Sequence, residues 1–329
     1  MTGFDFPAAG ISSICPHEGD TLIPVNLASP LKTPSVAPRS ESGLGLALMA
    51  GGMFLFSAVD TQAKFLTETL HPLQIVWVRQ LGLLLGVIVL LAVRGLPVLR
   101  TKNPILQISR GVLAASSATL FIVAVRYVPL ADAVAVSFVA PFIVTLFGAL
   151  ILREPVGIRR WSAVTIGFIG TLIVIRPGMG VIHPAVLLVI VAATLFAFRQ
   201  ILSRVLSGAD RTSTTVAYTA LAGSAVLTVP LPFVWTWPQT NLEIALLCGI
   251  AVLAALAELF VIKALEVAQA VVVAPVQYTL LLWSTMYGYL VFHHLPDFWT
   301  WVGALVIVAT GLYTLHRERV MARATRKTK

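Results

Sequence analysis

Long apolar runs alternate with short polar connections from Leu44 to His316. Most runs are about 20 residues long, which is the length that a helix needs to cross the hydrocarbon core of a membrane. The connections carry turn residues, as in "TETLHP", "SGADRT" and "HHLPD". The pattern predicts an all-α integral membrane protein with ten transmembrane helices, at 44–67, 72–93, 104–126, 129–152, 158–176, 184–206, 213–236, 243–265, 268–292 and 298–316.

The composition supports a multi-pass membrane protein. Hydrophobic residues make up 58% of the chain and charged residues only 11%, which departs strongly from ordinary globular proteins. The net charge of +9 does not indicate nucleic-acid binding, because most basic residues lie in short connections and in the final stretch "HRERVMARATRKTK". We therefore expect the lipid bilayer as surroundings and no nucleic-acid partner.

The distribution of basic residues predicts the orientation in the membrane. With an even number of spans both chain ends lie on one side, and that side then holds 17 of the 23 lysines and arginines. Only Lys64, Arg126 and Arg176 fall on the other side. Because basic residues concentrate in cytoplasmic connections, we expect both termini in the cytoplasm of a bacterial-type cytoplasmic (inner) membrane.

The chain ends are polar and carry no recognisable catalytic motif. Residues 1–42 lack the design of a signal peptide and are expected to form a disordered cytoplasmic extension. Residues 317–329 are expected to form a basic cytoplasmic tail. Cys15 and Cys248 fit neither a disulfide framework nor a zinc site. No catalytic residue, metal or cofactor is expected, and no Gly-rich loop with a lysine indicates direct use of ATP.

The two halves of the apolar region resemble each other. The stretch "MFLFSAVDTQAKFL" aligns with "ATLFAFRQILSRVL", which places Lys64 opposite Arg204. This similarity predicts two five-helix repeats, at residues 43–178 and 182–316. Because five is an odd number of crossings, the second copy enters the membrane from the opposite side, and the repeats are expected to be inverted.

The repeat places polar residues at two helix ends. Asp60 and Lys64 approach the outer end of the first span, whereas Arg199, Gln200 and Arg204 approach the inner end of the sixth. These ends are predicted to form the two gates of an alternating-access transporter. One alternative stays open: Asp60 and Lys64 are four residues apart and could simply neutralise each other on one helix face.

Arg79, Arg110, Arg199 and Glu258 are four of the charged residues within the predicted spans. A charge at the centre of a transmembrane helix costs roughly 2.5 to 3.5 kcal/mol on insertion scales. We therefore expect the arginines and Gln200 to bind substrate in a hydrated cavity, and Glu258 to carry a proton. The alternatives are that the arginines reach an interface or clamp helix ends, and that a neighbouring arginine holds Glu258 ionised.

Gln277, Tyr278 and Trp283 follow Pro275 in the ninth span. Proline loosens a helix and can expose backbone carbonyls, and aromatic rings form flat walls that suit a solute with an unsaturated ring. All three residues are expected to contact substrate. The alternative is that aromatic residues near span ends anchor the protein at the membrane interface.

The fifth and tenth spans are nearly free of charge and carry small residues, among them Ala163, Gly167, Gly170, Gly303 and Gly311. Small residues let membrane helices approach closely. These two spans are therefore predicted to form a scaffold or a homodimer interface.

Two blocks of sequence resemble the EamA family of the drug/metabolite transporter superfamily. They are "VPLADAVAVSFVAPFIVTLFGALILREPVGIRRWSAVTIGFIGTLIVIRPG" and "VAPVQYTLLLWSTMYGYLVFHHLPDFWTWVGALVIVATGLYTLHRER". The resemblance covers residues 44–318 and implies a ten-helix bundle of inverted repeats, alternating access, and solutes such as amino-acid-like compounds, nucleoside-like metabolites or vitamins. Family members often carry Gly-Glu where this chain has His293 and His294, whereas Glu154 keeps a carboxylate in the first repeat.

The favoured function is a secondary active transporter for a small organic metabolite, with proton coupling as an option. An arginine-rich cavity favours a carboxylate or phosphate, so an anionic or zwitterionic solute is expected. The alternative is a membrane-embedded enzyme that acts on a lipid or isoprenoid. Such an enzyme usually has clustered carboxylates or a histidine motif for a metal, and "HHLPD" is the only cluster of that kind.

Overall fold

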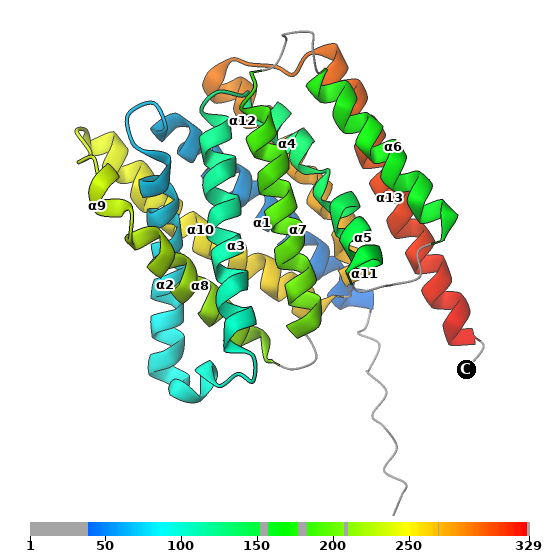
Figure 1. Cartoon of the computed structure of the whole chain (residues 1–329), viewed down its shortest axis with the longest axis horizontal. Coiled ribbons are helices and arrows are strands. Elements are labelled where there is room, and N and C mark those ends of the chain that lie inside the picture. The colour runs from blue at the N-terminus through cyan, green and yellow to red at the C-terminus, as the bar shows by residue number, and fades with distance from the viewer. Residues whose placement is uncertain (1–38, 152–156, 177–182, 207–209, 269, 328–329) are drawn as a thin grey trace, which may run out of the picture. The chain divides into compact units, whose positions relative to one another are not determined.

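The computed structural model describes residues 39–151, 157–176, 183–206, 210–268 and 270–327, and all regular structure in these ranges is helical (Figure 1). The predicted disordered extension, residues 1–42, lies outside the described residues up to residue 38. The elements are α1 (Arg39–Leu66), α2 (Pro72–Arg94), η1 (Leu96–Leu99), α3 (Pro104–Val125), α4 (Leu130–Ser137), α5 (Ala140–Leu150), α6 (Ile158–Ile175), α7 (Val186–Leu206), α8 (Thr212–Thr228), α9 (Leu231–Val234), α10 (Asn241–Val267), α11 (Ala270–Val273), η2 (Ala274–Tyr278), α12 (Thr279–Phe292) and α13 (Phe298–Lys327).

The predicted apolar windows coincide with these helices. Six segments are long and apolar enough to cross a membrane by length and composition, namely α1, α2, α3, the joined α4–α5 segment, α7 and α10. Shorter apolar helices occur at Trp161–Ile175 and Phe298–Thr314. The prediction of an all-helical integral membrane protein is thus confirmed, and the number of ten crossings stays a prediction.

Helix boundaries differ from the predicted windows in three places. α1 already begins at Arg39, and α13 continues as a helix to Lys327, through the segment predicted as a tail. The window 213–236 is divided at Pro230 between α8 and α9. Hydropathy marks only the stretch that lipid can cover, whereas backbone hydrogen bonds continue a helix through polar residues.

Two predicted spans are interrupted near their middle by proline. α4 ends at Ser137 and α5 begins at Ala140, next to Pro141; in the second half η2 begins at Ala274, next to Pro275. Proline has no N–H donor and its ring clashes with the carbonyl four residues earlier, so a regular helix cannot pass through it unchanged. The same Val-Ala-Pro triplet occurs at both interruptions, which places them at matching points of the two halves.

Helices of the first half pack mainly against helices of the second half. α1 lies along α10, α3 along α7 and α8, and α6 along α13 at one edge of the bundle (Figure 1). The largest buried cluster includes Val59, Ile75 and Val134 from the first half together with Ile250 and Ile307 from the second. The helices from α1 to α13 therefore share one core.

Small residues allow the closest of these contacts. A Cβ atom at Gly82 of α2 would overlap the backbone carbonyl of Ala251 in α10. Gly170 and Gly303 lie against each other where α6 meets α13. The small residues predicted for a scaffold or a homodimer interface thus serve contacts within the chain, and the homodimer stays a prediction.

We expect Gly82→Ala to lower the melting temperature of the detergent-solubilised protein strongly. The added methyl group meets backbone atoms of α10, and overpacking of this kind costs about 1 to 3 kcal/mol. Gly86→Ala is the matched control, because it lies one turn further along α2 and a Cβ there meets no atom within 4 Å. Similar melting temperatures for the two variants would contradict the close approach of α2 and α10.

Candidate functional site

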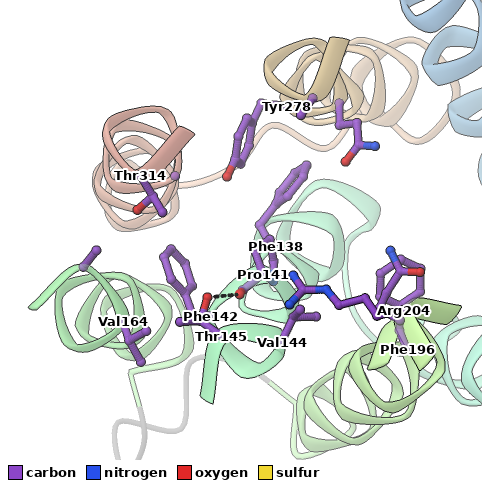
Figure 2. A pocket seen from close by; sticks show the side chains of 15 residues that line it. Phe138, Pro141, Phe142, Val144, Thr145, Val164, Phe196, Arg204, Tyr278 and Thr314 are labelled. Carbon is purple, nitrogen blue, oxygen red and sulfur yellow. Dashed lines mark hydrogen bonds between the residues drawn. The ribbon is translucent and has the colours of Figure 1, made fainter. Parts of the chain in front are cut away.

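A cavity of about 280 Å³ lies among α4, α5, α6, α7, η2 and α13. The proline interruptions of both halves border it (Figure 2). Its lining residues are Phe138, Pro141, Phe142, Val144, Thr145, Ala163, Val164, Phe196, Gln200, Arg204, Ala274, Gln277, Tyr278, Gly311 and Thr314. Three residues predicted to bind substrate, Gln200, Gln277 and Tyr278, are therefore brought together here.

Aromatic rings form much of the apolar wall. Phe138, at the interruption between α4 and α5, packs against Tyr278 at the end of η2, with ring centroids 5.0 Å apart. Phe142 of α5 and Phe196 of α7 add two further rings. Tyr278 fits because α13 presents Gly311 to it, where a Cβ atom would overlap the tyrosine hydroxyl. In Figure 2 this hydroxyl points toward the cavity.

Polar side chains occupy another part of the wall. Gln200 and Arg204 come from successive turns of α7, and Gln277 comes from η2. Neither glutamine amide has a hydrogen-bond partner within the described residues. The Arg204 side chain extends across the cavity toward Pro141 (Figure 2). The Thr145 hydroxyl is already engaged, because it donates to the carbonyl oxygen of Pro141 at 3.1 Å. Two amides and one arginine side chain thus form the polar part of the cavity wall.

Arg110 lies beside the cavity and does not line it. From α3 it donates to the Ser203 hydroxyl of α7 at 2.7 Å and to the Thr219 hydroxyl of α8. Ser203 in turn donates to the backbone carbonyl of Arg199 at 2.8 Å. These hydrogen bonds link a helix of the first half to two helices of the second half next to the cavity.

Arg199 also lies behind the cavity wall. Its guanidinium carbon is 4.6 Å from the centroid of the Phe196 ring, and Phe196 lines the cavity. Glu258 of α10 interacts electrostatically with Arg199 and Arg110. Among the described residues, however, Glu258 makes no ion pair within 4.0 Å. The structure therefore gathers three predicted site residues into one charged group behind Phe196.

The charged residues of the first span have separate partners. Asp60 pairs with Arg79 of α2, with 3.3 Å between Oδ1 and NH1, rather than with Lys64. The Lys64 ammonium donates to the carbonyl oxygens of Val125 and Val128 at 2.6 and 2.7 Å. Lys64 thus holds the end of α3 against the end of α1, and neither Asp60 nor Arg79 lines the cavity.

Trp283 lies away from the cavity. Its ring meets the ring of Phe54 in α1, with centroids 5.2 Å apart and planes at 83°. The neighbouring Ser284 shares a hydrogen bond of 3.2 Å with Ser57, also in α1. Trp283 therefore packs between α12 and α1, while Tyr278 of the same predicted span faces the cavity.

Several lining residues were not predicted because their side chains carry no polar group, among them Phe138, Phe142 and Phe196. One signal for them is visible in the sequence: Phe196, Gln200 and Arg204 are spaced four residues apart and so share one helix face. The matching Val-Ala-Pro triplets are a second signal, because they mark the two helix interruptions that border the cavity.

Asp210 joins two connections at the end of α7. It accepts hydrogen bonds from the Thr101 hydroxyl at 2.6 Å and the Gln107 amide at 2.7 Å. These two bonds hold the pKa of Asp210 below its ordinary value.

A carboxylate whose pKa is lowered by folding stabilises the folded protein at every pH above the pKa that the group has in the unfolded chain. Asp210→Asn should therefore lower the melting temperature at pH 7. The difference from the native protein should shrink as the pH falls toward 3, and a difference that is independent of pH would contradict this role.

A helical bundle with long apolar segments and a polar and aromatic cavity is typical of membrane solute transporters. The EamA-like transporter family matches residues 43–176 and, as a second copy, residues 183–315. The chain belongs to this family. It is accordingly a small-metabolite transporter and not an enzyme.

Relatives of the chain are named for three kinds of solute. The chain is 26% identical over 271 residues to an S-adenosylmethionine uptake transporter of Rickettsia prowazekii, which covers 81% of this chain and 92% of that protein. It is 33% identical over 230 residues to a riboflavin transporter of Vibrio cholerae, covering 69% and 77%. It is 29% identical over 273 residues to the pseudopaline exporter CntI of Pseudomonas aeruginosa, covering 82% and 94%. These names do not support the alternative of a lipid-modifying enzyme.

A solved crystal structure shares the fold. It superimposes with a TM-score of 0.58 at 17% sequence identity, over 85% of this chain and 98% of that one. This similarity concerns the arrangement of helices alone.

Proposed function

We propose that this protein is a secondary active transporter that moves a small anionic or zwitterionic metabolite with a planar ring by alternating access. The observation that carries the proposal is the composition of the cavity wall. Arg204, Gln200 and Gln277 line the cavity together with aromatic rings contributed by both halves. A ring can stack on those aromatic groups while an acidic group binds the guanidinium.

The charges around the cavity favour an anion. Behind Phe196, Arg110 and Arg199 interact with a single carboxylate, that of Glu258. Charges in a membrane-embedded site are weakly screened, so an excess of positive charge acts strongly on a ligand there. A carboxylate or phosphate in the cavity would balance that excess, whereas a purely cationic solute would add to it.

The size and the aromatic wall favour a compact ring compound. A volume of about 280 Å³ is close to the lower end of ordinary ligand pockets. Two relatives are named for S-adenosylmethionine and riboflavin, and both compounds contain a fused nitrogen heterocycle. The amides of Gln200 and Gln277 suit such a ring, because each can both donate and accept hydrogen bonds at its edge.

We further propose that ten helices cross the membrane as two inverted five-helix repeats, with both termini in the cytoplasm. Two copies of one family match and the matched proline interruptions support the repeat. The distribution of lysine and arginine supports the orientation. With this orientation, Arg204 in the last turn of α7 and Thr314 close to the end of the predicted tenth span, 298–316, support a cavity nearer the cytoplasmic side.

In the same frame, two sets of contacts join helices at the outer end of the bundle. Lys64 is bound to the carbonyl oxygens of Val125 at the end of α3 and of Val128 in the α3–α4 connection, and an ion pair between Arg176 and Asp297 joins the end of α6 to the start of α13. We propose that Lys64, together with the Asp60–Arg79 pair, contributes to the outer gate. Glu258 remains our proposal for proton coupling, since it faces the arginines beside the cavity.

A ligand screen with the purified protein tests the solute class. Melting temperatures should rise with ring compounds that carry a carboxylate or phosphate, for which S-adenosylhomocysteine, a zwitterion, and riboflavin 5′-phosphate are suitable probes. Methionine and ribitol 5-phosphate are matched compounds that keep the charged group and lack the ring. Stabilisation by cationic or wholly apolar compounds alone would overturn the assignment.

A further inference from the structure

Asp132 is a buried carboxylate at the end of the bundle opposite the cavity. It lies in the first turn of α4 and is 8% exposed. Its Oδ1 atom has no hydrogen-bond partner within the described residues. Burying a charged group without full pairing is costly, and a carboxylate can avoid that cost by binding a proton. No other part of the proposed mechanism uses this residue.

Charged and polar groups face Asp132 from three other elements. They are Lys64 of α1, Arg176 after α6, and Asp297 and Thr300 at the start of α13. The described parts of α3, α7 and α12, which also pack near α4, add no charged or titratable group to this set. The groups come from both halves of the chain, so their contacts form only when the outer ends of α4 and α13 are together.

The neighbours of Asp132 are engaged with one another. Lys64 is bound to the carbonyls of Val125 and Val128, and Arg176 is paired with Asp297. The Thr300 N–H also donates to Asp297, at 2.9 Å. The Thr300 hydroxyl is buried and, like Asp132 Oδ1, lacks a hydrogen-bond partner in the described chain. Asp132 is thus the one carboxylate of this cluster without an ion pair.

Asp297, unlike Asp132, is held in its ionised form by its neighbours. Its burial would raise its pKa, but the hydrogen bond from the Thr300 N–H and the charge of Arg176 outweigh that effect and hold the pKa of Asp297 below its ordinary value. Asp297 therefore stays ionised near neutral pH. A change of protonation in the cluster falls on Asp132.

We propose that Asp132 is a proton-binding gate residue that sets how readily the outer end opens. In the closed arrangement the carboxylate is buried and incompletely paired, so binding a proton from the outer solution removes a charge that closure would otherwise bury. In an open arrangement water would solvate the ionised carboxylate. Acid on the outer side should therefore favour the closed outer end, and alkaline solution should favour opening. This inference rests on the proposed alternating access and on no particular solute.

Cysteine labelling of the full-length protein in nanodiscs tests the proposal without a solute. In a background of Cys15→Ser and Cys248→Ala, Val128→Cys reports opening, because Val128 is 1% exposed and adjoins the Lys64 contact. Leu295→Cys, which is 63% exposed, corrects for the change of thiol reactivity with pH. The probe is a charged maleimide that does not enter lipid, and nanodiscs let it reach both faces of the membrane.

We expect the labelling rate of Val128→Cys, divided by that of Leu295→Cys, to rise about tenfold between pH 5 and pH 8. This change corresponds to proton binding that is about tenfold tighter in the closed arrangement than in the open one. Asp132→Asn should give a low ratio at every pH, and Asp132→Glu should restore the pH dependence. A purely structural role would lower stability without removing that profile. The same profile in Asp132→Asn, or a flat profile in the native protein, would overturn the switch. Labelling of Val128→Cys at no pH would contradict alternating access itself.

Discussion

Arg204→Gln is expected to weaken binding of an anionic or zwitterionic solute by about ten- to a hundredfold. The Arg204 side chain extends across the cavity toward Pro141 (Figure 2), where it can meet an acidic group. A hydrogen bond to a charged group contributes about 1.5 to 3 kcal/mol, and 1.4 kcal/mol corresponds to a factor of ten. Arg204→Lys keeps the charge but loses the planar fork, so an intermediate affinity is expected in a transport assay with proteoliposomes.

Arg94→Gln is the matched control for this substitution. Arg94 and Arg204 are both basic residues in the last turn of a helix, on α2 and α7, and Arg94 does not line the cavity. Its replacement should leave the affinity unchanged. If both variants lowered the affinity equally, the effect would belong to helix ends or membrane charge and not to the cavity. Melting temperatures of both variants separate a loss of binding from a loss of folding.

Gly311→Ala is expected to reduce transport about 5- to 150-fold, since overpacking costs about 1 to 3 kcal/mol and the displaced group is part of the cavity wall. A Cβ atom at this position would overlap the Tyr278 hydroxyl. The tyrosine must then turn away from α13, which also disturbs its packing on Phe138 at 5.0 Å. Initial transport rates at equal amounts of reconstituted protein measure the effect.

A double-mutant cycle shows whether the effect passes through Tyr278. Tyr278→Leu removes the hydroxyl and most of the ring, so adding Gly311→Ala to it should cause little further loss. Contacting residues usually show such non-additivity, whereas distant ones add. Fully additive losses would mean that Gly311 acts through another contact. Gly86→Ala, on the open face of α2, serves as the control for glycine replacement in a membrane helix.

The sequence allowed the cavity to be predicted in part, through polar residues close to helix breakers. Gln277 and Tyr278 follow Pro275, and Gln200 belongs to the span that repeats the pattern around Asp60. All three predicted site residues named here, Gln200, Gln277 and Tyr278, line the cavity. Hydropathy and repeat patterns succeed for such residues because a polar side chain within a membrane helix must face a partner or a cavity.

Partner choice and helix rotation could not be predicted from the sequence. Asp60 has Lys64 one helical turn away, yet its ion pair is with Arg79 on the next helix, because the packing angle of α1 and α2 decides which cation comes closer. Trp283 is only five positions after Tyr278, yet it faces Phe54 of α1. The residues from Ala274 to Tyr278 form a 3₁₀ helix, which has fewer residues per turn than an α-helix, so α-helical spacing cannot be extended across it.

Selective movement of a solute through reconstituted protein tests the central claim most directly. Proteoliposomes containing the native protein or Arg204→Gln would be loaded with a bacterial metabolite extract, and mass spectrometry would identify the compounds that leave. The account predicts that at least one ring compound with a carboxylate or phosphate leaves faster with the native protein, and that Arg204→Gln slows its release. Release of no compound, or of the same compounds at the same rates from both preparations, would contradict it.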